Sequence, residues 1–181
     1  MRSLVLAGGR SSRMGRDKAL IEVDGVACIA RVASALAAAG CEPIRIAVAQ
    51  PEDVERYGQV MPDGLDIEWV LDAFTHAGPI EAVVEALFDP LVADVDSIQL
   101  CPVDVPWVTA DLFLELEKTL GSGDLLARPA DPQRTHPLLA RVRPAVASTI
   151  GGDRRPLHVQ YSEMEHSTLL TAVSYTHLRA P

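Results

Sequence analysis

The sequence predicts an α/β fold with three layers, in which helices cover both faces of a doubly wound, mostly parallel sheet. Short apolar runs rich in β-branched residues alternate with segments whose apolar residues recur at helical spacing. The strand-like runs are apolar at consecutive positions, which is typical of strands buried on both faces. The chain has 181 residues, a length that suits one domain. We assign this single domain to residues 1–173.

The predicted elements of the first half follow in this order. A strand over 4–6 ends before two glycines. A helix near 26–39 is indicated by apolar residues at i, i+3, i+4 and i+7, and it ends at Gly40. Further along the chain we expect a strand over 44–48, a short helix that opens after Pro51, and a strand over 67–71.

The second half repeats the alternation. The helix that begins near Pro79 has its apolar side chains on one face, and a strand is predicted over 97–101. Thr109 is expected to cap the next helix, because a threonine side chain can accept a hydrogen bond from a free helical N–H group. Strand character returns at Leu125 and again over 168–173.

Composition excludes several classes of protein. With 48% hydrophobic and 4% aromatic residues, the chain can form a core of alanine, valine and leucine and is not a disordered protein. No apolar run approaches the ~20 residues of a membrane span, and no signal peptide follows Met1. Three widely spaced cysteines predict reduced core thiols and a cytoplasmic location. The net charge of −9 argues against nucleic acid and anionic membranes as partners.

The charge is unevenly distributed along the chain. The first basic stretch, residues 1–20, has five cationic side chains against Asp17 alone, and the second basic stretch, residues 128–155, has six arginines against two aspartates. The remaining residues are strongly acidic. Two basic stretches in an acidic chain predict a focused site for a small polyanion.

The loop after the first strand has the features of a phosphate-binding loop. In open α/β sheets ligands bind beyond the carboxyl ends of the strands. Gly8 and Gly9 allow backbone N–H groups to approach phosphate oxygens, while Arg13 and Lys18 can bind them through charge. The alternative is a flexible loop with solvated arginines. The spacing fits neither a Walker loop nor the three-glycine fingerprint of nicotinamide-dependent oxidoreductases, so the latter class is disfavoured.

Residues 6–20 closely resemble the signature of the molybdenum cofactor guanylyltransferase family. The resemblance continues, over about residues 3–160, in five further motifs: Val70-Leu71-Asp72, Ala77-Gly78-Pro79-Ile80, Cys101-Pro102-Val103-Asp104-Val105-Pro106, Thr135-His136-Pro137-Leu138 and Gly152-Asp153-Arg154-Arg155. It implies a Rossmann-like fold of the nucleotide-diphospho-sugar-transferase type.

The resemblance also implies roles for individual residues. The nucleotide contacts expected from it and from the glycine loop are Leu6, Ala7, Gly8, Gly9, Lys18, Asp72 and Asp104. Asp104 would also bind Mg²⁺, as a hard carboxylate oxygen at the end of a buried strand. The expected catalytic residues are Arg13, Lys18 and Asp104, and the residues expected on the acceptor side are His136, Arg154 and Arg155.

The activity implied by the resemblance is transfer of GMP from GTP to the phosphate of molybdopterin, with release of pyrophosphate. A cofactor-delivery protein would be a further partner. The alternatives are a related transferase that uses CTP or another acceptor, and a non-catalytic carrier of a nucleotide or cofactor. In the family an asparagine-containing segment, which helps to bind metal, follows the last strand. Residues 174–181 do not resemble it, and we predict that they are a non-native tail after a truncated reading frame.

Overall fold

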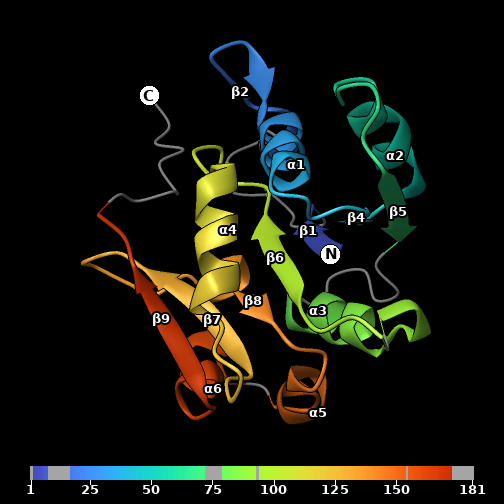
Figure 1. The fold of residues 1–181 in the computed structure, drawn as a ribbon. Coiled ribbons are helices and arrows are strands. Elements are labelled where there is room, and N and C mark those ends of the chain that lie inside the picture. The colour runs from blue at the N-terminus through green and yellow to red at the C-terminus, as the bar shows by residue number, and fades with distance from the viewer. Residues whose placement is uncertain (1, 8–16, 72–78, 93, 154, 173–181) are drawn as a thin grey trace.

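A seven-stranded sheet forms the centre of the molecule in the computed structural model (Figure 1). The structure describes residues 2–7, 17–71, 79–92, 94–153 and 155–172. In spatial order the strands are β5 (Ile67–Leu71), β4 (Ile44–Val48), β1 (Arg2–Leu6), β6 (Ile98–Pro102), β8 (Arg141–Val142), β7 (Leu126–Ala130) and β9 (His166–Leu170). Every pairing is parallel except the two that β8 makes. The mostly parallel sheet predicted from the sequence is confirmed.

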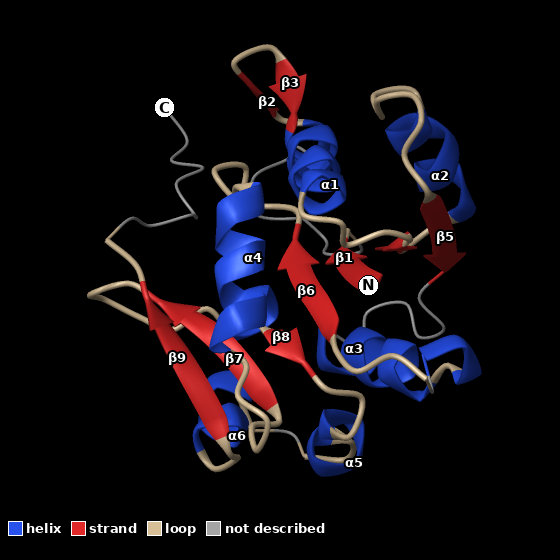
Figure 2. Ribbon diagram, in the orientation of Figure 1, coloured by secondary structure: helices blue, strands red, loops and turns tan. Residues whose placement is uncertain are grey.

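Helices cover both faces of this sheet and complete the three layers (Figure 2). One face is covered by α1 (Cys28–Ala38), α2 (Pro51–Gly58) and α4 (Ala110–Thr119). The other is covered by α3 (Pro79–Phe88), α5 (Val146–Ile150) and α6 (Leu157–Ser162). The remaining short elements are the hairpin of β2 (Glu22–Val23) and β3 (Val26–Ala27) and the 3₁₀ turns η1 (Lys18–Leu20), η2 (Pro90–Val92) and η3 (Pro137–Leu139).

The hydrophobic core is divided by the sheet into two halves. Val5 and Cys101 pack under the face that carries α1 and α4, whereas their neighbours Leu4 and Leu100 pack under the opposite face. Successive strand residues point to opposite faces, so a strand buried on both sides must be apolar at consecutive positions. This is why β1, β4 and β6 each contain apolar residues at consecutive positions, such as Leu4-Val5-Leu6 in β1.

Most predicted elements are present, and the differences are in short segments. Thr109 caps α4 as predicted, because its hydroxyl accepts a hydrogen bond from Leu112 N at 3.4 Å. The hairpin β2–β3, strand β8 and helices α5 and α6 were not predicted. Strand β9 begins at His166, two residues before the predicted start. The predicted tail, residues 174–181, lies outside the described residues.

The three cysteines are free and buried, as expected for core thiols. Burial raises the pKa of the Cys41 thiol to about 11, which keeps it protonated at neutral pH. In the described part of the chain, no helix is both long enough and apolar enough to pass through a bilayer.

Candidate active site

The order of the strands places a topological switch point between β1 and β6. From β1 the chain proceeds outward through β4 to β5, and it then returns to β6 on the other side of β1. Such a reversal separates the loops that follow the two central strands, and ligands of open α/β sheets bind in the resulting crevice.

Lys18 and Asp104 meet at this crevice. Lys18 Nζ lies 2.9 Å from Asp104 Oδ2, and the two side chains are 36% and 38% exposed. Lys18 is the first residue of η1, which Asp17 caps by accepting a hydrogen bond from Ala19 N at 3.1 Å. The pair thus joins a cation and a carboxylate that are 86 residues apart in sequence, and solvent can reach both.

The position of Asp104 is set by a hydrogen bond that continues the pairing of β1 with β6 beyond the end of β6. Leu6 O accepts a hydrogen bond from Val103 N at 3.4 Å, so the strand pairing continues past the end of β6 to the residue before Asp104. Ala7 N donates to Ala47 O at 2.9 Å on the other side. Leu6 and Ala7 lie at the carboxyl end of β1, as predicted, although neither lines the cleft described next.

A cleft of about 360 Å³ opens beside the Lys18–Asp104 pair. One wall consists of this pair and the residues that flank Asp104. The other consists of the segment that follows β7. The lining residues are Lys18, Pro102, Asp104, Val105, Arg134, Thr135, His136, Pro137, Leu138 and Leu139. The volume suits a small-molecule ligand, and the walls offer both charges and apolar surface.

The second wall is held in place by a buried aspartate. Asp131 accepts hydrogen bonds from Gln133 N at 2.8 Å, from Arg134 N at 3.0 Å and from His136 Nε2 at 2.8 Å. These hydrogen bonds, the one from Gln133 N above all, lower the pKa of Asp131 to about 2. Because an ionised carboxylate can only accept, His136 Nε2 carries the hydrogen. Asp131 therefore fixes both the loop and the orientation of the His136 ring.

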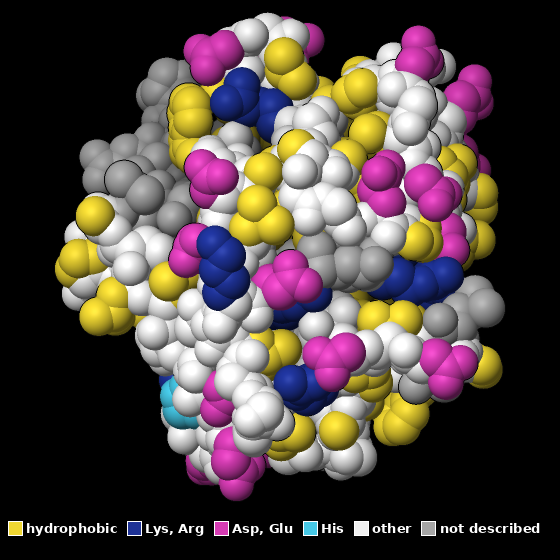
Figure 3. Space-filling model, viewed as in Figure 1, with side chains coloured by type: hydrophobic (Ala, Val, Ile, Leu, Met, Phe, Trp, Pro, Cys, Tyr) yellow, Lys and Arg dark blue, Asp and Glu magenta, His cyan; other side chains and the backbone are white. Residues whose placement is uncertain are grey.

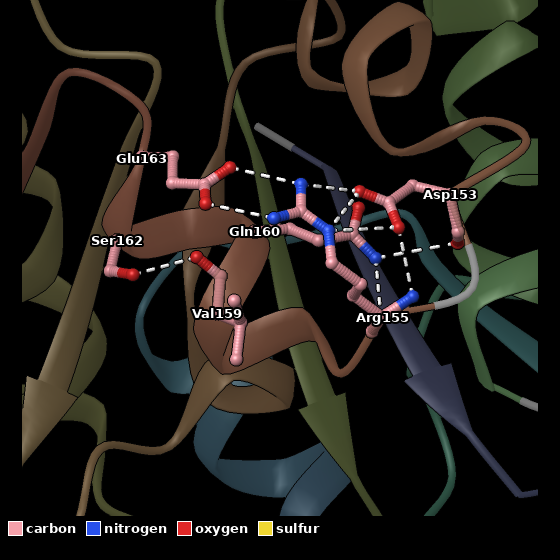
Figure 4. Close-up of polar contacts among 6 residues, drawn as sticks. All are labelled: Asp153, Arg155, Val159, Gln160, Ser162 and Glu163. Carbon is pink, nitrogen blue, oxygen red and sulfur yellow. Dashed lines mark hydrogen bonds and ion pairs between the residues drawn. The ribbon is translucent and has the colours of Figure 1, made fainter.

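Arg155 forms hydrogen bonds with two carboxylates away from the cleft (Figure 4). Its Nη1 and Nη2 donate to the two carboxylate oxygens of Glu163 at 2.8 and 2.9 Å, and its Nε and Nη2 donate to Asp153 Oδ2 at 3.0 and 2.8 Å. The two carboxylates raise the pKa of Arg155, and the Arg155 guanidinium in turn lowers the pKa values of Asp153 and Glu163. Arg155 does not line the cleft, so the structure does not bring it together with His136.

The other arginines of the second basic stretch are also dispersed. Among the described residues, three donate to partners away from the cleft. These contacts join Arg128 to His158 O, Arg141 to Ser97 and Glu117, and Arg143 to Asp96 and Asp124 O. On the face in Figure 3, cationic and acidic side chains lie interspersed. Of the arginines described in this stretch, Arg134 is the one that lines the cleft.

Several predicted site residues lie outside the described part of the chain: Gly8, Gly9, Arg13, Asp72 and Arg154. Two contributors to the cleft were not predicted. Arg134 resembles the five other arginines of its stretch in sequence, and Asp131 resembles an ordinary turn residue before Pro132. Only the distance between Asp131 and His136 in the folded chain identifies the aspartate as part of the site.

Comparison with known proteins shows the family. The profile of the MobA-like NTP transferase domain matches residues 3–160. A probable molybdenum cofactor guanylyltransferase from Opitutus terrae is 37% identical over 119 residues, which is 66% of this chain and 55% of the relative. Another from Synechococcus elongatus is 31% identical over 153 residues, or 82% of this chain and 74% of that protein. The chain thus spans little more than half of the first of these relatives.

A solved structure supports the fold. The molybdopterin-guanine dinucleotide biosynthesis protein A of Archaeoglobus fulgidus superposes with a TM-score of 0.68, covering 94% of this chain and 83% of that protein at 19% identity. At 19% sequence identity, this superposition supports the fold alone, that is, the arrangement of helices and strands. Together with the profile match over residues 3–160, it establishes that the chain belongs to the MobA-like NTP transferase domain family.

Proposed function

We propose that this protein is a molybdenum cofactor guanylyltransferase, which transfers GMP from GTP to the phosphate of molybdopterin and releases pyrophosphate. The observation that carries the proposal is the Lys18–Asp104 pair at 2.9 Å, which lies at the topological switch point and lines the cleft. A lysine and an aspartate on the loops after the two central strands can bind a triphosphate and its counter-ion. The names of the relatives support the choice of guanine nucleotide and pterin acceptor.

The proposed reaction is a single in-line displacement. An oxygen of the acceptor phosphate forms a bond to the α-phosphorus of GTP. The bond from that phosphorus to the oxygen bridging to the β-phosphate breaks, and its electron pair leaves with pyrophosphate. No covalent enzyme intermediate is required, so the protein contributes by positioning and by charge stabilisation. Lys18 would neutralise negative charge on the phosphates.

Asp104 fits a magnesium ion that is bound together with the nucleotide. Among the described residues there is no cluster of three histidine, cysteine, aspartate or glutamate side chains that could hold a metal alone. Mg²⁺ in nucleotide sites is commonly bound by one or two carboxylates together with substrate phosphates, and Asp104 supplies one such carboxylate beside the cleft. In this proposal Asp104 holds Mg²⁺, which when bound neutralises phosphate charge.

The wall that follows β7 is proposed to bind the acceptor. Arg134 and His136 line the same cleft as the Lys18–Asp104 pair. An arginine can form two parallel hydrogen bonds to a phosphate, and Asp131 keeps the His136 ring in one orientation. The acceptor phosphate would therefore enter between the two walls.

The reaction itself tests the proposal. The protein with MgGTP and molybdopterin should release pyrophosphate and form the guanine dinucleotide of the pterin. GTP should raise the melting temperature more than CTP does, because only the preferred ligand stabilises strongly. A larger shift with CTP would instead support the related cytidylyl transfer. Tight nucleotide binding without pyrophosphate release would support the carrier.

A further inference from the structure

We propose that Tyr57, on α2, is a positioning residue for Lys18 and acts through the carboxylate of Asp17. The inference rests on the proposed function, in which Lys18 acts on the phosphates of the nucleotide. Tyr57 lies outside the motifs that predicted the site. It is 3% exposed, and its hydroxyl lies 2.9 Å from Asp17 Oδ2, to which it donates a hydrogen bond.

Three donors converge on Asp17. Its Oδ1 accepts from Ala19 N at 3.1 Å, which caps η1. Its Oδ2 accepts from Tyr57 Oη at 2.9 Å and from Arg56 Nη2 at 3.0 Å. Asp17 thereby connects the turn that carries Lys18 to helix α2, which packs on the sheet through the buried ring of Tyr57.

The turn depends on this connection because it is very short. η1 comprises three residues, and one 3₁₀ turn has too few hydrogen bonds to be stable alone. The lysine side chain is flexible, so the position of its ammonium group depends on a fixed backbone. The hydrogen bond from Tyr57 to Asp17 helps to hold that backbone at the end of the turn before Lys18, while the buried Ala19 anchors the other end in the core.

The same contact controls which carboxylate pairs with Lys18. Asp17 is the immediate neighbour of Lys18, and an unoccupied Asp17 carboxylate would compete with Asp104 for the ammonium group. Tyr57 and Arg56 occupy Asp17 Oδ2, while Lys18 pairs with Asp104. Burial and the neighbouring Asp17 raise the pKa of Tyr57, so its hydroxyl remains a donor throughout the pH range of an assay.

Tyr57→Phe tests the inference, since it removes the hydroxyl and retains the ring. We expect kcat for pyrophosphate release to fall about tenfold, while KM for GTP changes by less than about threefold. Tyr161→Phe is the matched control. Tyr161 is also fully buried, and its hydroxyl has no hydrogen-bond partner among the described residues, so its removal should leave both constants unchanged.

A double variant separates positioning from general destabilisation. If Tyr57 acts through Lys18, Tyr57→Phe should have no further effect on kcat once Lys18→Ala is present, because residues that act as a unit are not additive. A role limited to folding would instead lower kcat by the same factor in both backgrounds. If Tyr57→Phe lowers kcat by the same factor in the parent and in Lys18→Ala, the inference is overturned.

The outcomes distinguish failure of the inference from failure of the proposed function. A parent protein that neither binds GTP nor releases pyrophosphate overturns both. An active parent that is slowed by Lys18→Ala but not by Tyr57→Phe overturns the inference alone. If Tyr57→Phe does not fold, Arg56→Gln removes the other donor to Asp17 Oδ2 from a half-exposed side chain. It should lower kcat about two- to threefold, and an unchanged kcat would overturn the inference.

Discussion

The two basic stretches of the chain differ in the exposure and the ion-pair partners of their cationic side chains. In the first, Lys18 lines the cleft and, among the described residues, pairs with the carboxylate of Asp104, both side chains being more than one-third exposed. In the second, Arg155 is held by two carboxylates and Arg141 is 3% exposed. Cationic residues that are clustered in sequence are therefore placed in different environments by the fold.

The difference shows that cations in two basic stretches can have unlike environments, one partly exposed beside a cleft and one held by two carboxylates. Arg155 donates to Asp153 and to Glu163, which are two and eight residues away in sequence, and these contacts join the start and end of the segment that contains α6. Lys18 has a partner in a separate loop, and that loop borders the cleft. Substitutions in the two stretches should consequently have different effects on activity and stability. Four experiments test the comparison.

Removal of Lys18 should have the largest effect. Lys18→Ala is expected to reduce the rate of pyrophosphate release about 10²- to 10³-fold, the size found when one electrostatic contact to a transition state is lost. Single-turnover measurement with saturating MgGTP would detect it. Lys118→Ala is the control, because Lys118 is the other lysine of the chain and pairs with Glu115 on the exposed face of α4. An equal loss of rate in Lys18→Ala and Lys118→Ala would contradict the role proposed for Lys18.

The next largest effect is expected at Asp104. Asp104→Asn retains the size of the side chain but removes its charge, and should lower kcat about 10²-fold by weakening metal binding. Electron paramagnetic resonance of Mn²⁺ with GTP present would report the metal directly. Asp111→Asn, in the exposed first turn of α4, should bind Mn²⁺ as the parent does. Unchanged Mn²⁺ binding in Asp104→Asn would exclude Asp104 as the ligand.

A pair of arginine variants compares the two positions within the second stretch. Arg134→Gln should raise KM for the acceptor about tenfold, because a charged hydrogen bond to phosphate is lost at the cleft. Arg155→Gln should leave that KM unchanged and lower the melting temperature slightly, because its partners are the exposed Glu163 and Asp153. The sequence predicted an acceptor role for Arg155. A similar rise of KM in both variants would support that role.

The smallest effect is expected at Asp131, and it should depend on pH. The folded-state pKa of about 2 lies below the unfolded value of about 3.9. The ionised carboxylate therefore stabilises the fold above about pH 4, and this contribution is lost as the pH falls through 2. Asp131→Asn should lower the melting temperature at pH 7, with the difference shrinking between pH 4 and pH 2. Asp63→Asn, in an exposed loop, provides the comparison, and a difference that is constant with pH would contradict the prediction.

The sequence predicted long elements better than short ones. The helix capped by Thr109 and the strands over 44–48 and 67–71 were correct because each contains a full hydrophobic pattern. Strand β8 contains only two residues, too few to show an alternation. It exists because its backbone pairs with β6 and β7, which are distant in sequence.

The same limit applies to the site. Lys18, Asp104 and His136 were predicted individually, from the loops that contain them and from the resemblance to a family. Asp131 was not, because its function in the structure depends on contacts with Gln133 N, Arg134 N and His136. The role of Tyr57 likewise depends on the approach of α2 to η1.

The sequence alone determined which side chains follow each strand, because hydrophobic patterns mark where strands end and parallel strands end at one edge of the sheet. Only the tertiary structure decided which charged side chains face the cleft. That choice depends on the counter-charges that the fold brings within hydrogen-bonding distance, from a distant segment in the case of Asp104 and Lys18 and from a neighbouring helix in the case of Glu163 and Arg155. Local sequence records the charge of a residue, whereas the fold determines its partner.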